Sequence, residues 1–153
     1  MAEIEKRLEG MGLVLPAAPL PGGNYVPHKK VGEMLYLAGV TCVEEGELTH
    51  AGQVGDAQTV ESGKEAAKVC ALNALAAAKG ALGDLDRIKE VVYMGGYVNA
   101  VAGFAESPQV INGASDLFAE LLGEAGLHAR AAVAVAGLPK NATVEIQVNL
   151  RFE

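Results

Sequence analysis

The sequence of 153 residues contains no tryptophan, and aromatic residues make up only 5% of it. Because half of the residues are hydrophobic, we expect a core of small aliphatic side chains with closely approaching backbones. This length is enough to bury such a core and suits one domain over residues 1–153. Within it, residues 1–21 are predicted to form a short helix and a Pro-rich connector.

Positive charge is also scarce. Twelve Lys and Arg residues oppose 19 Asp and Glu residues, giving a formal net charge of −7 at pH 7. Nucleic-acid binding relies on concentrated positive charge, and no run of Lys or Arg is longer than Lys29–Lys30. We therefore expect no nucleic-acid partner, although a single well-placed arginine can still bind a small anion.

Metal-type motifs and long apolar runs are missing as well. Cys42 and Cys70 lack metal-ligand spacing, the three histidines are scattered, and Cys70 is expected to be a buried thiol. The N-terminus has no apolar segment typical of a secretory signal, and the longest apolar stretch is interrupted by Lys68, Asn73 and Lys79. The sequence thus predicts a cytoplasmic protein with no metal site and no membrane partner.

Hydrophobic periodicity predicts the order helix, strands, helix, strand, helix, strand, strand. The expected elements are a helix at 3–12, short strands around 24–28 and 33–39, a helix from Ser62 or Thr59 to Gly83, a strand at 88–100, a helix at 107–126 and two strands within 128–153. Strand–helix–strand steps favour one mixed sheet in the α/β (α+β) class. Two long helices can cover only one face of this sheet, so the other face must meet water or another chain.

The C-terminal segment 128–153 reads as two strands joined by a turn at 137–142. In the second strand, apolar and polar residues alternate, so the apolar row is expected to face the helices. Glu145 lies in the polar row. In the first strand, Arg130 precedes a run made only of alanine and valine.

If these strands pair as a hairpin with Ala136 opposite Thr143, then Arg130 and Glu145 share the polar face. They would lie roughly 13 Å apart along the strands, which is too far for a salt bridge. Ala132 and Ala134 lie between them and leave a shallow floor with room for a ligand or a neighbouring subunit. The alternative is that Arg130 only solvates a strand end and that Glu145 is one polar residue among several.

The segment "HARAAVAVAGLPKNATVEIQVNL" resembles the C-terminal signature of the Rid family, also called YjgF or, by an older name, L-PSP endoribonuclease. The segments "GGNYVP", "LYLAGVT", "CALNALAAAKGALGDLDRI" and "INGASDLFAELLGE" resemble the family in the same order, from about Gly22 to the C-terminus. The likeness is greatest to a branch with a longer N-terminus. It implies a chorismate-mutase-like fold of the bacillary type, assembled as a homotrimer with a central β-barrel and ligand clefts between subunits.

The resemblance also implies an activity, the hydrolysis of reactive 2-imino (enamine) acids to 2-oxo acids and ammonia without a metal or organic cofactor. Arg130 matches the family arginine that binds the carboxylate of a small ligand, and Glu145 matches the acid that positions the attacking water. Tyr25 matches a cleft tyrosine, and Asn112 matches a helix asparagine near the cleft. Ala132 departs from the family because many members have a cysteine there.

Two other functions remain open. The same clefts could hold a 2-oxo acid without turnover, as a non-catalytic binding module. The older family name points to an endoribonuclease or translation inhibitor, which the net charge of −7 disfavours. Without the resemblance, Tyr25 is equally explained as a strand-edge aromatic residue, and Asn112 as a partly exposed helix residue.

Overall fold

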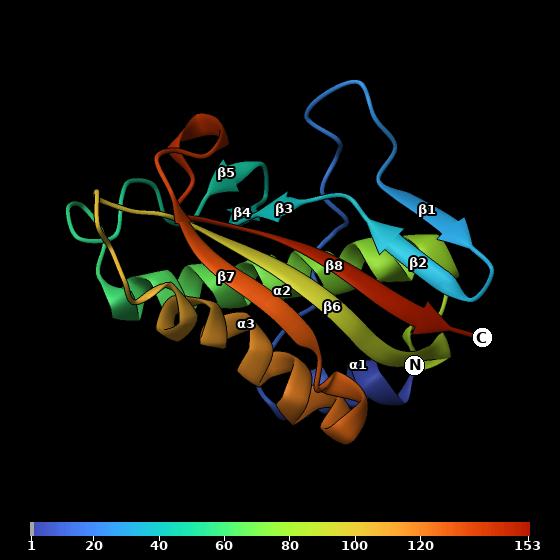
Figure 1. The fold of residues 1–153 in the computed structure, drawn as a ribbon. Coiled ribbons are helices and arrows are strands. Elements are labelled where there is room, and N and C mark those ends of the chain that lie inside the picture. The colour runs from blue at the N-terminus through green and yellow to red at the C-terminus, as the bar shows by residue number, and fades with distance from the viewer. Residues whose placement is uncertain (1) are drawn as a thin grey trace.

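The computed structural model describes residues 2–153, and its elements follow the predicted order (Figure 1). The helices are α1 (Glu3–Gly10), α2 (Val60–Leu82) and α3 (Ser107–Leu122). The longer strands are β1 (His28–Val31), β2 (Met34–Leu37), β6 (Ile88–Asn99), β7 (Ala129–Val135) and β8 (Val144–Phe152). Shorter elements are β3 (Val40–Thr41), β4 (Val43–Glu44), β5 (Glu47–Leu48) and the 3₁₀ turns η1 (Leu85–Arg87), η2 (Gly123–Gly126) and η3 (Pro139–Asn141).

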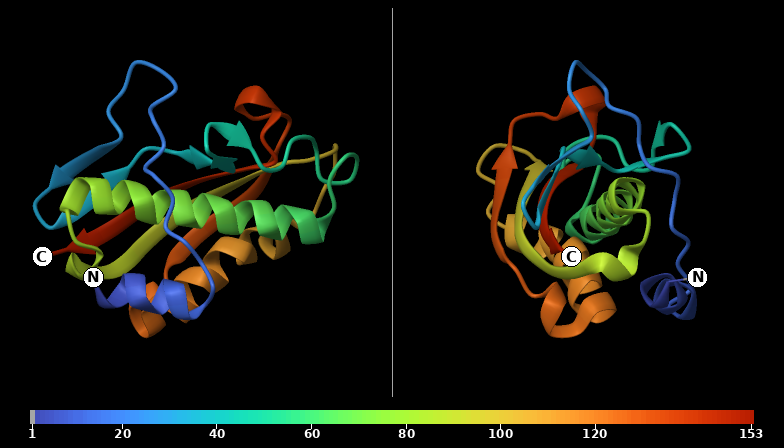
Figure 2. Two further views of the ribbon diagram at one scale, coloured as in Figure 1. Left: turned by 180° about the vertical axis from the view of Figure 1, so that it is seen from behind. Right: turned by 90° about the vertical axis from the view of Figure 1, so that its right-hand side faces the viewer.

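The main sheet is mixed, as predicted. Its strand order is β1-β2-β8-β6-β7, and β3 also pairs with β8. The β6–β7 pair is parallel, whereas the other pairs are antiparallel. Helices α2 and α3 lie on one side of this sheet, which confirms the predicted layering and leaves the second face uncovered within one chain (Figures 1 and 2).

The core lies between the helices and the sheet. The apolar row of β8 faces this core, as the alternation predicted. All five of its residues are buried: Val144, Ile146, Val148, Leu150 and Phe152. Helix α2 contributes mainly alanines, whose short side chains let the helix lie close to the strands. Cys42 and Cys70 are both buried and unbridged, so the expectation of a buried thiol at Cys70 is confirmed.

Two glycines allow α3 to pack closely against α2 and the sheet. A Cβ atom on Gly113 would overlap the carbonyl oxygen of Lys64, so the backbones of α2 and α3 touch there. A Cβ on Gly96 of β6 would lie 2.7 Å from the side chain of Ile111. Glycine at this position of the strand therefore allows α3 to pack closely on the sheet.

Helix α2 begins at the earlier of its two predicted starts. The Thr59 hydroxyl accepts a hydrogen bond from the Ser62 backbone at 3.1 Å, while the Thr59 backbone donates to the Ser62 hydroxyl at 2.9 Å. This reciprocal cap satisfies two groups at the helix terminus and fixes where the long helix starts. Gly83, with φ of 79°, ends the helix in the left-handed conformation.

The predicted pairing of the two C-terminal strands is wrong. Strand β6 lies between β7 and β8 and pairs with both of them. Residues 136–143 are long enough to cross this intervening strand, since two strand spacings measure roughly 10 Å. With β6 in the middle, its backbone groups are hydrogen-bonded along both edges, which a simple hairpin would not achieve.

No helix among residues 2–153 combines the length and apolar character needed to cross a bilayer.

Candidate functional site

Arg130 lies near the start of β7, an edge strand of the sheet, and its side chain lies on the face that the helices cover. Arg130 pairs with Met94 of β6, and Met94 pairs with Val148 of β8. The side chains of Met94 and Val148 are both buried against the helices. The guanidinium extends to α3, where Nη1 donates to Ser115 Oγ at 2.8 Å and Nη2 donates to the carbonyl oxygen of Pro108 at 3.1 Å. Two contacts on one helix therefore hold this cation at the open edge of the sheet.

The charge of Arg130 has no counter-ion within residues 2–153, where no carboxylate lies at ion-pair distance from it. A guanidinium has five N–H donors, and the bonds to Ser115 and Pro108 use two of them. Three donors stay available in a planar arrangement that matches a carboxylate. The geometry suits the binding of a small anion.

Two further predicted residues lie beside this arginine. Asn112 is half-buried on α3, one turn after Pro108 and close to one turn before Ser115, so it shares the helix face that holds Arg130. Ala132 follows Arg130 by two residues on β7, points to the same side and packs at the margin of the core. The structure thus gathers Arg130, Asn112 and Ala132.

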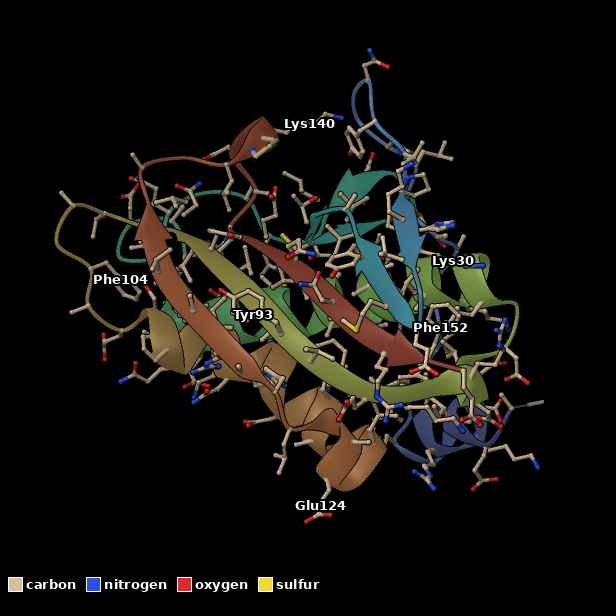
Figure 3. All side chains as sticks on the ribbon, turned by 45° about the vertical axis from the view of Figure 1, so that its right-hand side comes forward. Lys30, Tyr93, Phe104, Glu124, Lys140 and Phe152 are labelled. Atoms are coloured by element: carbon tan, nitrogen blue, oxygen red, sulfur yellow. The ribbon has the colours of Figure 1, made fainter. Side chains whose placement is uncertain are left out.

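A cavity of about 330 Å³ lies at the end of β7. It is lined by Gln53, by residues 100–104 and by Ala134, Val135 and Ala136. Phe104 lies in the loop that leads into α3 (Figure 3), four residues before the Pro108 carbonyl that holds Arg130. The row of small side chains that starts beside the cation therefore leads to a largely apolar hollow.

Glu145 lies on β8, beside Tyr97 of β6 and Thr41 of β3. Within residues 2–153 its carboxylate makes neither a hydrogen bond nor an ion pair, and its Oε2 would lie 2.8 Å from a Cβ built on Gly39. The side chain is half-buried, and this burial raises the pKa of Glu145. A carboxylate with a raised pKa is a better proton acceptor than a solvated one.

Arg130 and Glu145 do not share a face, contrary to the prediction from the assumed hairpin. Arg130 is in register with Met94 and Glu145 with Tyr97. Met94 and Tyr97 are three residues apart on β6 with no register shift between them, so their side chains point to opposite faces. One copy of the chain therefore cannot bring both side chains to the same small ligand.

The face that carries Glu145 also carries tyrosines that sequence reasoning missed. The strand pairings place three tyrosines on this face: Tyr36 and Tyr93 pair with Asn149 of β8, and Tyr97 pairs with Glu145. Figure 3 shows Tyr93 on the side away from the helices. A Cβ on Gly95 would lie 2.8 Å from the hydroxyl of Tyr97, so this glycine lets the ring extend along the sheet. No sequence signal marked this group, because its members share a face only through the pairing of β2 and β6 with β8.

Tyr25 lies apart from the other predicted residues. It is half-exposed in the segment before β1, at the end of the sheet opposite β7. Its hydroxyl accepts a hydrogen bond from the Gly22 backbone at 2.9 Å, which closes the local loop. Within one chain it does not meet Arg130.

One further cavity carries no chemistry that we can assign. A larger cavity of about 670 Å³ lies between α1, the N-terminal connector and α2, and Lys79 is part of its lining, which includes none of the predicted site residues. The Lys79 Nζ is 2.6 Å from Glu5 Oε1, so its charge is already paired. In the described part of the chain, no three His, Cys, Asp or Glu side chains are grouped to hold a metal ion.

A family profile described as "YjgF/chorismate mutase-like, putative endoribonuclease" matches residues 5–150. Protein TCP17 of Trypanosoma cruzi is 42% identical over 144 residues, covering 94% of this chain and 90% of that protein. The crystal structure of protein Atu1372 from Agrobacterium tumefaciens is 46% identical with a TM-score of 0.92, covering 98% of this chain and 92% of that one. RidA from Psychrobacter sp. PAMC 21119 is 28% identical with a TM-score of 0.64, covering 88% and 94%.

These matches span nearly the whole chain and confirm the family that the C-terminal segment suggested. They agree with the mixed sheet and its two covering helices. The chain belongs to the Rid/YjgF family and has its chorismate-mutase-like fold.

Proposed function

We propose that the protein hydrolyses 2-imino acids, which interconvert with enamine acids, to 2-oxo acids and ammonia. The site lies between copies of a homotrimer and uses Arg130 of one copy and Glu145 of its neighbour. The observation that carries this proposal is that a held cation, Arg130, and a half-buried carboxylate, Glu145, lie on opposite faces of one sheet. Neither has a charged partner within residues 2–153. A second copy placed against the uncovered face brings one of each together.

Arg130 binds the substrate carboxylate. Its free N–H donors accommodate both carboxylate oxygens, and the two bonds to α3 hold the guanidinium plane while they do so. Fixing the carboxylate also fixes the adjacent C2 carbon, which carries the C=N bond. Orientation of this kind supplies a large share of rate acceleration in reactions that join two molecules.

Glu145 positions the attacking water and accepts its proton. The water oxygen bonds to C2 while the C=N π electrons move to nitrogen, giving a tetrahedral carbon that carries both a hydroxyl and an amino group. Glu145 returns the proton it took from water to this nitrogen, which completes the amino group. The carboxylate then takes the hydroxyl proton and passes it to the nitrogen as the C–N bond breaks, so ammonia leaves and the carbonyl forms. Because burial raises the pKa of Glu145, this carboxylate exchanges protons more readily near neutral pH.

The other predicted residues shape the cleft. Asn112 supplies an amide beside Arg130, and Tyr25, carried at the far end of the sheet, enters the cleft from the neighbouring copy. Ala132 leaves space where many family members have a cysteine, and the cavity at the end of β7 receives an apolar substituent of the substrate. No step in this chemistry requires a thiol, since water is the nucleophile.

The test generates an imino acid in solution with an amino-acid oxidase and follows its decay with and without the protein. Several parent amino acids, both apolar and polar, are compared, with heat-denatured protein as the control. Faster decay supports the proposal. No acceleration for any parent, together with tight binding of 2-oxo acids, would instead show a binding module. RNA cleavage that persists through a high-salt purification would show the nuclease.

Glu145→Gln is expected to lower kcat by about 100-fold or more, since the amide cannot accept the proton from water. It should also raise stability at pH 7. A raised folded-state pKa stabilises the fold fully below the ordinary value of 4.5 and loses that contribution as pH rises through the raised pKa. The melting temperature of the variant should therefore exceed that of the wild type at pH 7 and converge with it near pH 4. Lower stability at pH 7 would contradict this reading of the burial.

Ala132→Phe is expected to lower kcat/KM by about 10- to 100-fold while the protein stays folded, because a ring beside Arg130 fills the floor of the cleft. Ala132→Cys is the matched control, since it restores the residue common in the family and should keep most of the activity. Thermal unfolding separates a blocked site from a damaged sheet. Full activity in the Phe variant would place the substrate elsewhere.

A further inference from the structure

A chain of hydrogen bonds continues from Arg130 into the junction between α3 and the start of β7. The hydroxyl of Ser115, which accepts from Arg130 Nη1 at 2.8 Å, lies 2.9 Å from His128 Nε2. On the other side of the ring, His128 Nδ1 lies 2.7 Å from the carbonyl oxygen of Gly126. The hydrolysis described above uses Ser115 only as a hydrogen-bond partner of Arg130 and gives no role to His128.

The donors and acceptors in this chain fix its direction. Arg130 can only donate, so Ser115 Oγ is the acceptor of that bond and its own hydrogen is free to point to His128. The Gly126 carbonyl can only accept, so His128 carries its proton on Nδ1. Nε2 of a neutral ring is then an acceptor, and it takes the Ser115 hydrogen. All three bonds are satisfied together with the proton on Nδ1.

The groups in this series of hydrogen bonds are held by close backbone and ring contacts with α3. A Cβ on Gly126 would overlap the carbonyl oxygen of Phe118, so the 3₁₀ turn η2 lies directly on the backbone of α3. The Phe118 ring meets the His128 ring edge to face, with centroids 6.0 Å apart and planes at 87°. Phe118 and Ser115 are one turn apart on α3, so a single helix face positions the imidazole from two sides.

We propose that Ser115 and His128 are positioning residues that set the orientation of the Arg130 guanidinium for a planar carboxylate. His128 directs the Ser115 hydrogen away from Arg130, which leaves a lone pair of Oγ facing Nη1. Ser115 and the Pro108 carbonyl then pin one edge of the guanidinium and present the remaining donors to the ligand. This inference rests on the proposed function only in that Arg130 binds the ligand carboxylate.

The test measures binding of pyruvate, the simplest 2-oxo acid, and of its neutral amide, pyruvamide, to matched pairs of variants. Ser115→Ala removes the hydroxyl and Ser115→Thr keeps it. His128→Leu removes the acceptor and His128→Gln places an amide oxygen near Nε2. We expect the Ala and Leu variants to weaken pyruvate binding by about tenfold, and the Thr and Gln variants to stay within about threefold of the wild type. Pyruvamide binding should not follow this pattern, since it lacks the carboxylate.

With imino acids as substrates, the Ala and Leu variants should raise KM by about the same tenfold factor while kcat changes less, as expected when a ground-state contact is lost. Nitrogen-15 NMR of the His128 ring provides a readout that needs no ligand. The wild type should show the Nδ1–H tautomer, and Ser115→Ala should shift the Nε2 resonance because its hydrogen bond is gone.

The outcomes separate this inference from the proposed function. Pyruvate binding without imine hydrolysis would overturn only the proposed function. Unchanged pyruvate affinity in Ser115→Ala, equal losses in all four variants, or a proton on Nε2 in the wild type would overturn only the positioning role. A wild-type protein that does not bind pyruvate would overturn both.

Discussion

Arg130→Ala is expected to lower kcat/KM for 2-imino acids by about 100- to 1,000-fold, which corresponds to the loss of a bidentate charged contact. Arg130→Lys should remain at least about tenfold below the wild type, because an ammonium cannot present the planar donor pair. The reason is structural as well as electrostatic. The bonds to Ser115 and Pro108 are built for a guanidinium, and a lysine would reach at most one of them.

The measurement is steady-state hydrolysis combined with pyruvate affinity and melting temperature. Arg130 has no ion-pair partner in the described chain, so the alanine variant should stay folded. Near-normal activity in that variant would remove the carboxylate anchor from the proposal.

Mixing two inactive variants tests whether the site is shared between copies. Arg130→Ala keeps Glu145, and Glu145→Gln keeps Arg130. After unfolding and refolding together in equal amounts, about a quarter of the clefts should contain one intact residue of each kind, so about a quarter of wild-type activity should return. Each variant refolded alone is the control. No recovery in the mixture would show that both residues act within one chain or that the site is not shared.

Gly113→Ala is expected to destabilise the protein by about 3 kcal/mol, the largest effect on stability that we anticipate. Helix propensity alone predicts the opposite sign, since alanine stabilises a helix interior relative to glycine. Here the added methyl group would overlap the carbonyl oxygen of Lys64 in α2. This oxygen is backbone and cannot rotate away, so the two helices would have to separate.

Chemical denaturation of Gly113→Ala and of a matched control, Gly80→Ala, would measure this effect. Gly80 is in α2, and a Cβ there would meet only Ala18, at 3.9 Å. The control should therefore be stabilised, by up to about 1 kcal/mol. Equal changes in the two variants would show that the close approach of the helices is not a constraint on this fold.

Much of the fold could be predicted from local pattern. The period of the apolar residues separates the helices from the strands, and the alternation in β8 identifies the row that faces the core. The pairing of β7 and β8 could not be predicted in this way. Nearness along the chain favours a hairpin, whereas a central β6 is specified by long-range packing, including Gly96 against Ile111. The connecting turn has positive φ at Lys140 and Asn141, which local propensity does not predict.

The candidate site was predictable to a similar degree. Family resemblance identified Arg130 and Glu145, but their faces depend on the register with β6, so the sequence could not show that they point apart. The Ser115 and Pro108 contacts were also missed, because they join segments far apart in sequence and leave no periodic signal. His128 could be recognised only as a residue near Arg130 in the chain.

The position of β7 at the end of the sheet has a consequence for production and storage of the protein. A terminal strand of alanine and valine has few bulky or charged side chains that would stop another chain from pairing with its outer backbone edge. A subunit whose β7 edge is uncovered can therefore pair with another chain through its unpaired backbone groups. Protein lost through pairing at this strand would then be found as precipitate during expression rather than as soluble, inactive protein.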